Sequence, residues 1–74
     1  MTLHELGQTL RQMYEEAPSG RQVTMIHLFG IRFAKEIRAG GYSPASIAED
    51  AGISRNYATE ISKGMNLSEY VVEK

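Results

Sequence analysis

Apolar residues recur at steps of three and four over the first part of the chain, which is the spacing of one face of an α-helix. Thr2 and Glu5 stand at the spacing of a capping box, in which a hydroxyl and a carboxylate bond free backbone N–H groups of the first turn. Pro18 cannot continue the hydrogen-bond ladder, so a helix is predicted over residues 2–17. Its apolar stripe, expected to lie in the core, consists of Leu3, Leu6, Leu10, Met13 and Ala17.

The second segment is apolar around nearly its whole circumference. Thr24 is a suitable cap and Gly40-Gly41 a suitable stop, so a helix is predicted over residues 24–39. A helix of this kind is buried between neighbours or against a second chain. Its central Gly30 is expected to permit a close crossing with the first helix near Gly7. One stripe consists of Ile26, Phe29, Phe33 and Ile37, and the other side carries Leu28 and Ile31.

Two shorter helices are predicted in the second half of the chain. Ser43-Pro44 gives the expected order of cap and first helical residue, so one helix is predicted over residues 44–51. Ser54 is a suitable cap for the next helix, predicted over residues 54–63. Gly64 is the expected stop of that helix.

Length and composition limit the fold further. A chain of 74 residues is predicted to form one all-α domain, 1–74, a small four- to five-helix bundle in which residues 65–74 fit either a short helix or an extended tail. The absence of cysteine excludes disulfides and thiolate metal sites. No apolar run is long enough to span a bilayer. We therefore expect a cytoplasmic protein that does not contact a membrane.

The segment PASIAEDAGISRNYATEISK, residues 44–63, has the layout of two short helices joined by a tight turn. Ala48 is small, so the second helix can approach the first closely. Gly52 stands at the turn, where a left-handed backbone conformation is favourable for glycine and costly for a residue with a Cβ. The remaining apolar anchors of this unit are Ile47, Ala51, Ile53, Ala58 and Ile61.

On these residues the segment resembles the helix-turn-helix of phage-repressor-type transcription regulators. The flanking sequences MIHLFGIRFAKEI and EISKGMNLSEYV are also similar to those of short bacterial HTH-like proteins, over nearly the whole chain. The resemblance implies that the helix over 54–63 is the recognition helix, whose early residues contact base edges in the major groove. Its expected base contacts are Arg55, Asn56, Thr59 and Glu60, and the expected phosphate contacts are Ser43, Ser46, Ser54, Tyr57 and Lys63.

The chemistry of the outer arc of this helix suits DNA. A projection at 100° per residue places the arc opposite Ala58 and Ile61. Arg55 offers two donors to guanine and Asn56 pairs with adenine, while Glu60 accepts from cytosine N4 but is repelled by phosphates. The alternatives are a solvated polar face and, for the tyrosines at 57 and 70, packing at the rim of the core.

The charge balance is the main argument against DNA. The formal net charge is −1, and residues 44–74 hold three basic and five acidic side chains, a net of −2. Cations that release counterions from phosphates are therefore scarce, and a monomer should bind weakly. A homodimer doubles the contacts and places two half-sites about 34 Å apart. The expected dimer interface consists of Leu28, Ile31, Tyr70 and Val71.

Enzyme chemistry finds little support in the sequence. His4-Glu5 begins like a zinc-protease helix, but Gln8 stands where the second histidine is needed. His27 lies within an apolar helix. A histidine in such a position is more often a hydrogen-bonded residue at the edge of the core than a metal ligand. No phosphate-binding glycine loop is present, so neither catalysis nor a metal or cofactor is expected.

Two functional hypotheses remain. The first is a sequence-specific protein that binds double-stranded DNA, a small transcriptional regulator such as a repressor. The second is an interaction adaptor that keeps the helix-turn-helix shape and binds a protein partner instead of DNA.

Overall fold

The computed structural model describes residues 1–74 and contains helices without any strand, which confirms the all-α fold class. Helix α1 covers Leu3–Glu15, α2 covers Gln22–Gly40 and α3 covers Pro44–Ala51. A single 3₁₀ turn, η1, covers Arg55–Tyr57 and leads directly into α4, Ala58–Leu67. No helix is both long and apolar enough to cross a bilayer.

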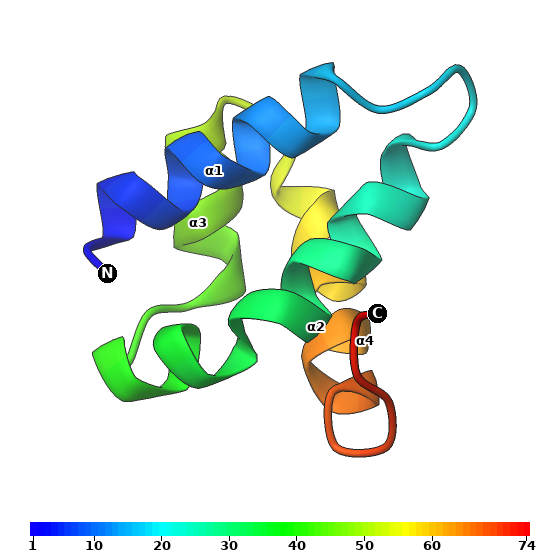
Figure 1. Ribbon diagram of the computed structural model, residues 1–74. Coiled ribbons are helices and arrows are strands. Elements are labelled where there is room, and N and C mark those ends of the chain that lie inside the picture. The colour runs from blue at the N-terminus through cyan, green and yellow to red at the C-terminus, as the bar shows by residue number, and fades with distance from the viewer.

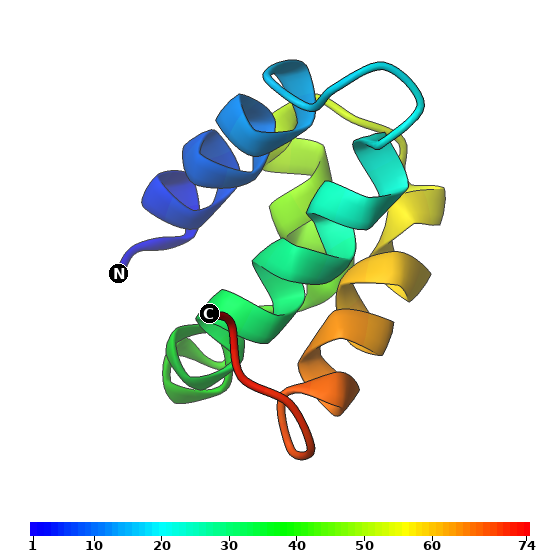
Figure 2. The ribbon, with the colours of Figure 1, turned by 45° about the vertical axis from the view of Figure 1, so that its right-hand side comes forward.

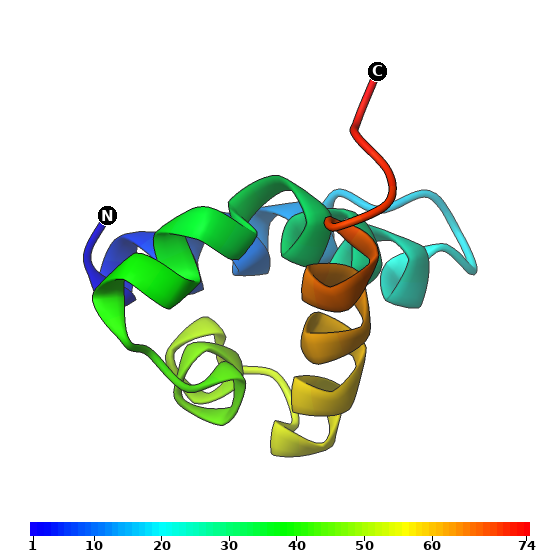
Figure 3. The ribbon, with the colours of Figure 1, turned by 90° about the horizontal axis from the view of Figure 1, so that it is seen from below.

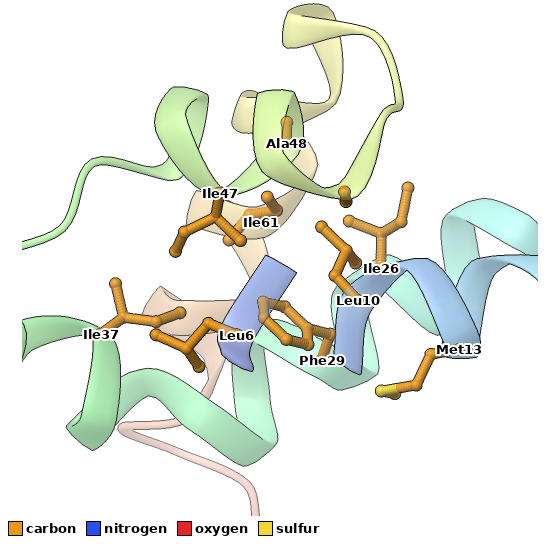
Figure 4. Packing of buried hydrophobic residues seen from close by; sticks show 10 residues of the cluster. Leu6, Leu10, Met13, Ile26, Phe29, Ile37, Ile47, Ala48 and Ile61 are labelled. Carbon is orange, nitrogen blue, oxygen red and sulfur yellow. The ribbon is translucent and has the colours of Figure 1, made fainter. Parts of the chain in front are cut away.

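Helix α2 is the central element of the bundle (Figure 1). Its closest partner is α4, which lies alongside it, and α1 covers α3 on the other side of the molecule (Figure 2). The buried side chains of all four helices meet between these layers (Figure 4). The core consists of Leu6, Leu10, Met13, Ile26, Phe29, Ala34, Ile37, Ile47, Ala48, Ala51 and Ile61.

Most helix ends follow from local rules. The capping box of α1 is present, with the Thr2 hydroxyl accepting from the Glu5 N–H at 3.1 Å and the Glu5 carboxylate accepting from the Thr2 N–H at 2.7 Å. The Ser43 hydroxyl caps α3 by accepting from the Ser46 N–H. Gly41 ends α2 with φ 68° and Gly52 ends α3 with φ 77°, both in the left-handed region. The expected start of α1, the expected end of α2 and both expected ends of α3 are confirmed, whereas α1 ends at Glu15 and leaves Ala17 outside the helix and the core.

The start of α2 differs from the prediction. The helix begins at Gln22, two residues before Thr24, and the cap position is Arg21, which makes no side-chain capping bond. Thr24 lies exposed within the first turn instead of capping it. The N–H of Arg21 is bonded to the carbonyl of Pro18, so a backbone turn after α1 leads into the helix. No side-chain signal marks that kind of start in a sequence.

Gly64 does not end α4, contrary to the prediction, because it is where α4 crosses α2. Gly64 is buried, and a Cβ placed there would overlap the carbonyl oxygen of His27. A Cβ at Gly30 would lie 2.5 Å from the carbonyl oxygen of Ile61. The close crossing expected for Gly30 therefore exists, but its partner is Gly64, not Gly7. Gly7 instead faces the side chain of Asp50 on α3.

The C-terminal residues settle the question that the sequence left open. Residues 65–67 complete α4, residues 68–70 form a turn, and residues 71–74 are irregular. The Nε of Arg32 on α2 donates to the Glu73 carboxylate at 2.8 Å, which ties the end of the chain to α2. That contact lowers the pKa of Glu73 and raises that of Arg32.

Candidate nucleic-acid interface

Helices α3 and α4 form a helix-turn-helix unit around Gly52. The Gly52 N–H bonds the carbonyl of Glu49 at 3.0 Å, and the Ile53 N–H bonds the carbonyl of Ala48 at 3.1 Å. These two bonds close the end of α3 and turn the chain towards α4. Figure 3 shows α3 nearly along its axis while α4 runs across the view, so the two helices lie steeply crossed. Such a crossing is typical of helix-turn-helix units.

The second helix of this unit begins as a 3₁₀ turn, not as the regular α-helix that was expected from residue 54. Ser54 caps the turn, since its hydroxyl accepts from the Asn56 N–H at 3.1 Å. The helical projection predicts Ser54 beside Ala58 and Ile61, but Ser54 is exposed. The 3₁₀ turn rotates Arg55 and Asn56 relative to an ideal α-helix, because it has three residues per turn instead of 3.6.

Exposed polar side chains form one continuous stripe along η1 and α4. Four expected members, Arg55, Asn56, Thr59 and Lys63, are exposed as predicted. Asn66 is a fifth, one helical turn beyond Lys63, and it lies past Gly64, the predicted end of this helix. Asn66 stands seven residues after Thr59, close to two helical turns, and this spacing indicates that the two side chains share one face of the helix. We call this set the reading stripe: Arg55, Asn56, Thr59, Lys63 and Asn66.

Glu60 was expected on the outer arc, and the structure contradicts this. Its side chain is only 19% exposed and its Oε1 lies 2.9 Å from Nε2 of His27 on α2. The Lys63 ammonium is 3.3 Å from the other Glu60 oxygen. The His27 hydrogen bond lowers the pKa of the Glu60 carboxyl against the opposing effect of desolvation, with a smaller contribution from Lys63. Glu60 is therefore held against α2, and His27 is a satisfied boundary residue.

Arg55 is exposed but not unpartnered. Its side chain is 70% exposed, and its Nε lies 3.0 Å from Oε1 of Glu49 on α3. Both cations of the reading stripe are thus paired with a carboxylate, Arg55 with Glu49 and Lys63 with Glu60. The pairs keep the local net charge low, in agreement with the acidic composition of this half of the chain.

Three of the expected phosphate contacts lie in two places, Tyr57 at the rim of the core and Ser43 and Ser46 at the start of α3. Tyr57 packs against Tyr14 with ring centroids 5.7 Å apart, and the two hydroxyls lie 3.5 Å apart. Sharing this hydrogen bond raises the pKa of Tyr14. This contact agrees with the packing role at the rim that was the alternative for Tyr57, and its phosphate contact stays a prediction. Ser43 and Ser46 cluster at the start of α3, where the Ser43 hydroxyl donates to that of Ser46 at 2.8 Å.

The residues expected at a dimer interface do not share one environment. Leu28 packs partly against the core, and Ile31 lies with Val71 along a shallow groove between α2 and the C-terminal residues. Tyr70 and Val72 are both more than four-fifths exposed, at 83% and 87%, and Val71 between them is 43% exposed. The exposed apolar surface is therefore concentrated near the C-terminus, in Leu67, Tyr70, Val71 and Val72.

The fold and the reading stripe define the class of a helix-turn-helix protein. A family model described as an HTH-like domain matches residues 2–74, and the chain therefore belongs to the HTH-like domain family. Membership points to DNA-binding regulators in general. Neither the curated proteins nor the solved structures contain a match. The finer resemblance of residues 44–63 to phage-repressor-type units stays a prediction.

Proposed function

We propose that the protein binds double-stranded DNA in a sequence-specific manner and acts as a small transcriptional regulator that contacts the major groove with η1 and α4. The reading stripe is the observation that carries this proposal. Five polar side chains with hydrogen-bonding capacity lie exposed along one side of the second helix of a helix-turn-helix unit. That helix is the element which enters the groove in proteins of this architecture. A regulator of this kind acts in the cytoplasm, at the nucleoid.

Each member of the stripe has a role in this proposal. Arg55 donates to guanine O6 and N7, and Asn56 donates to and accepts from adenine. Thr59 contacts a thymine methyl or a base edge through its hydroxyl. Lys63 and Asn66, further along α4, bond phosphates, together with Ser43 and Ser46 at the positive end of the α3 dipole. Glu60 is left out because it is bonded to His27.

The shortage of free cations makes a homodimer the working form in this proposal. Each phosphate contact by a cation releases counterions, and one copy of the stripe has only two cations, both paired. Two copies related by a two-fold axis double the contacts and contact half-sites about 34 Å apart. Tyr70 and Val71, with Leu28 and Ile31 on α2, are the proposed interface between the copies, since Tyr70 is 83% exposed.

Selection from a random duplex pool tests the proposed function. We expect enrichment of a sequence that contains a guanine and an adenine within each half-site. On the enriched duplex, Arg55→Ala should cost about 1–3 kcal/mol of binding free energy per half-site, and Lys63→Ala should lower the slope of log affinity against log salt by about 1 per half-site. Arg21→Ala is the matched control, because Arg21 is exposed, lies outside the stripe and removes the same charge. A pool that enriches no sequence would refute the proposal.

The second candidate function is a protein-binding adaptor, favoured by one specific observation. A shallow groove beside the stripe is lined by His27, Lys63, Asn66, Leu67 and Tyr70, of which the last two are large exposed apolar residues. Salt separates the two functions. Affinity for DNA falls steeply between low and moderate ionic strength, whereas an apolar protein contact in this groove keeps its affinity.

A further inference from the structure

An ion pair crosses the turn of the helix-turn-helix unit. Glu49 lies in the last turn of α3, and Arg55 is the first residue of η1. The Nε of Arg55 is 3.0 Å from Oε1 of Glu49, while both side chains stay more than half exposed. The pair therefore connects the two helices at the surface that the proposed function places against DNA.

Helix stability does not explain the position of Glu49. A carboxylate in the last turn of a helix faces the negative end of the helix dipole, which disfavours it. Glu49 is followed directly by Asp50, and α3 has no basic residue in its last turn. Repulsion of phosphate also makes a carboxylate unfavourable on a DNA-binding face. The contact with Arg55 is the one favourable interaction of the Glu49 side chain in the structure.

The geometry of the guanidinium group shows what this contact leaves free. The group is planar and has five N–H donors in a fixed arrangement. The Glu49 carboxylate lies on the Nε side of the group, beside the stem of the side chain, with Oε1 3.0 Å from Nε. The two terminal nitrogens make no hydrogen bond within the protein, and these are the donors that bond guanine O6 and N7 side by side. Attraction to a carboxylate on the Nε side thus limits the rotation of the group without using the donors that face a base.

We propose that Glu49 is a positioning residue for sequence specificity, which holds Arg55 so that its two terminal nitrogens face one guanine in the major groove. This inference rests on the proposed function. It differs from the simpler explanation, in which Glu49 only neutralises Arg55 and repels DNA. Under that explanation the loss of Glu49 raises the affinity for every sequence alike. Under our proposal it lowers the preference for guanine at one base pair.

The experiment measures base preference with the full chain. Competition binding uses the duplex enriched from the random pool and the three duplexes that differ from it at the base pair contacted by Arg55. That base pair is identified as the position where Arg55→Ala abolishes discrimination. For Glu49→Ala, we expect the preference at this position to fall about two- to fivefold, the range for an exposed ion pair, with the other positions unchanged. Glu49→Gln, which keeps an acceptor oxygen without the charge, should retain part of the preference.

Two controls separate positioning from charge. Glu69→Ala removes the same charge from an exposed residue outside the ion pairs, and should leave every preference intact. In the double variant, Glu49→Ala should add nothing to the loss caused by Arg55→Ala. Equal gains in affinity for all four duplexes, with the preference intact and with Gln and Ala alike at position 49, would overturn the inference while the proposed function stands. Failure of the wild type to enrich any duplex would overturn both.

Discussion

Two glycines of the helix-turn-helix unit have the same sequence context and opposite structural roles. Gly52 and Gly64 each follow a short amphipathic segment, and each was expected to end a helix. Gly52 is exposed, has φ 77° and ends α3. Gly64 is buried in the interior of α4, where its missing Cβ lets the helix lie against the backbone of α2 at His27. One glycine supplies backbone freedom and the other supplies space.

The difference determines the length of the reading stripe. Because α4 continues through Gly64 to Leu67, Asn66 joins the exposed side of the helix. The crossing at Gly64 also holds α4 along α2, and this leaves the opposite side of α4 free for a partner. The position of the stripe thus depends on a contact between two helix backbones as much as on the turn at Gly52.

The largest effect is expected for Gly64→Ala. The added Cβ would overlap a backbone carbonyl that cannot rotate away, so the cost lies at the upper end of the range for overpacking, about 3 kcal/mol. For a domain of this size the melting temperature should fall by more than roughly 10 °C in a thermal melt followed by circular dichroism. Gly30→Ala should act alike from the other side of the crossing.

The exposed Asn66→Ala on the same helix is the control, and its melting temperature should stay close to that of the wild type. If Gly64→Ala were as stable as Asn66→Ala, the close crossing of α2 and α4 would be contradicted.

A smaller loss is expected for Gly52→Ala. Nothing but the end of the Arg11 side chain, 3.4 Å away, lies near a Cβ at this position, so the cost comes from the left-handed backbone alone. That cost is about 1–2 kcal/mol of unfolding free energy, measurable by urea titration. Gly52→Asn should recover part of it, because asparagine tolerates this conformation. Equal stability of the alanine and glycine forms would contradict the left-handed turn.

Asn66→Ala should weaken DNA binding without affecting the fold. Loss of one hydrogen bond from the end of each stripe should cost about 1 kcal/mol of binding free energy per half-site on the enriched duplex, measured by fluorescence anisotropy. Gln8→Ala on α1, an exposed residue far along the chain from the stripe, is the control. An unchanged affinity would mean that the stripe ends before Gly64 in its contact with DNA.

The smallest effect is expected for Glu60, whose carboxylate is bonded to His27 and does not belong to the reading stripe. The pKa of Glu60 is lowered in the folded protein, chiefly by the His27 hydrogen bond. This contribution to stability is therefore present above the unfolded value of about 4.3 and is lost as the pH falls through the folded pKa. Glu60→Gln should reduce the loss of stability as the pH falls below the unfolded pKa, measured as the urea midpoint at each pH. The exposed Glu69→Gln should keep the wild-type slope, and the same slope in Glu60→Gln would contradict the inward position of Glu60.

Local chemistry was predictable from the sequence, and contacts between helices were not. Thr2, Ser43 and Gly52 were assigned correctly because caps and left-handed turns depend on a few consecutive residues. The exposed members of the stripe up to Lys63 followed from periodicity in the same way.

Glu60 was misplaced because its position depends on His27, a residue more than 30 positions away in the chain. Gly64 was misassigned for a related reason, since a glycine that ends a helix and one that admits a neighbouring helix look identical in a sequence. The start of α2 was missed because no side chain caps it.

Methylation interference on the enriched duplex tests the central claim most directly, namely that the reading stripe lies in the major groove. Dimethyl sulfate methylates guanine N7 in the major groove and adenine N3 in the minor groove. We predict that methylation of one guanine N7 per half-site blocks binding of the wild type, that the same methylation has no further effect on Arg55→Ala, and that methylated adenine N3 is tolerated. Interference confined to adenine N3, or interference at guanine N7 that persists in full in Arg55→Ala, would contradict the account.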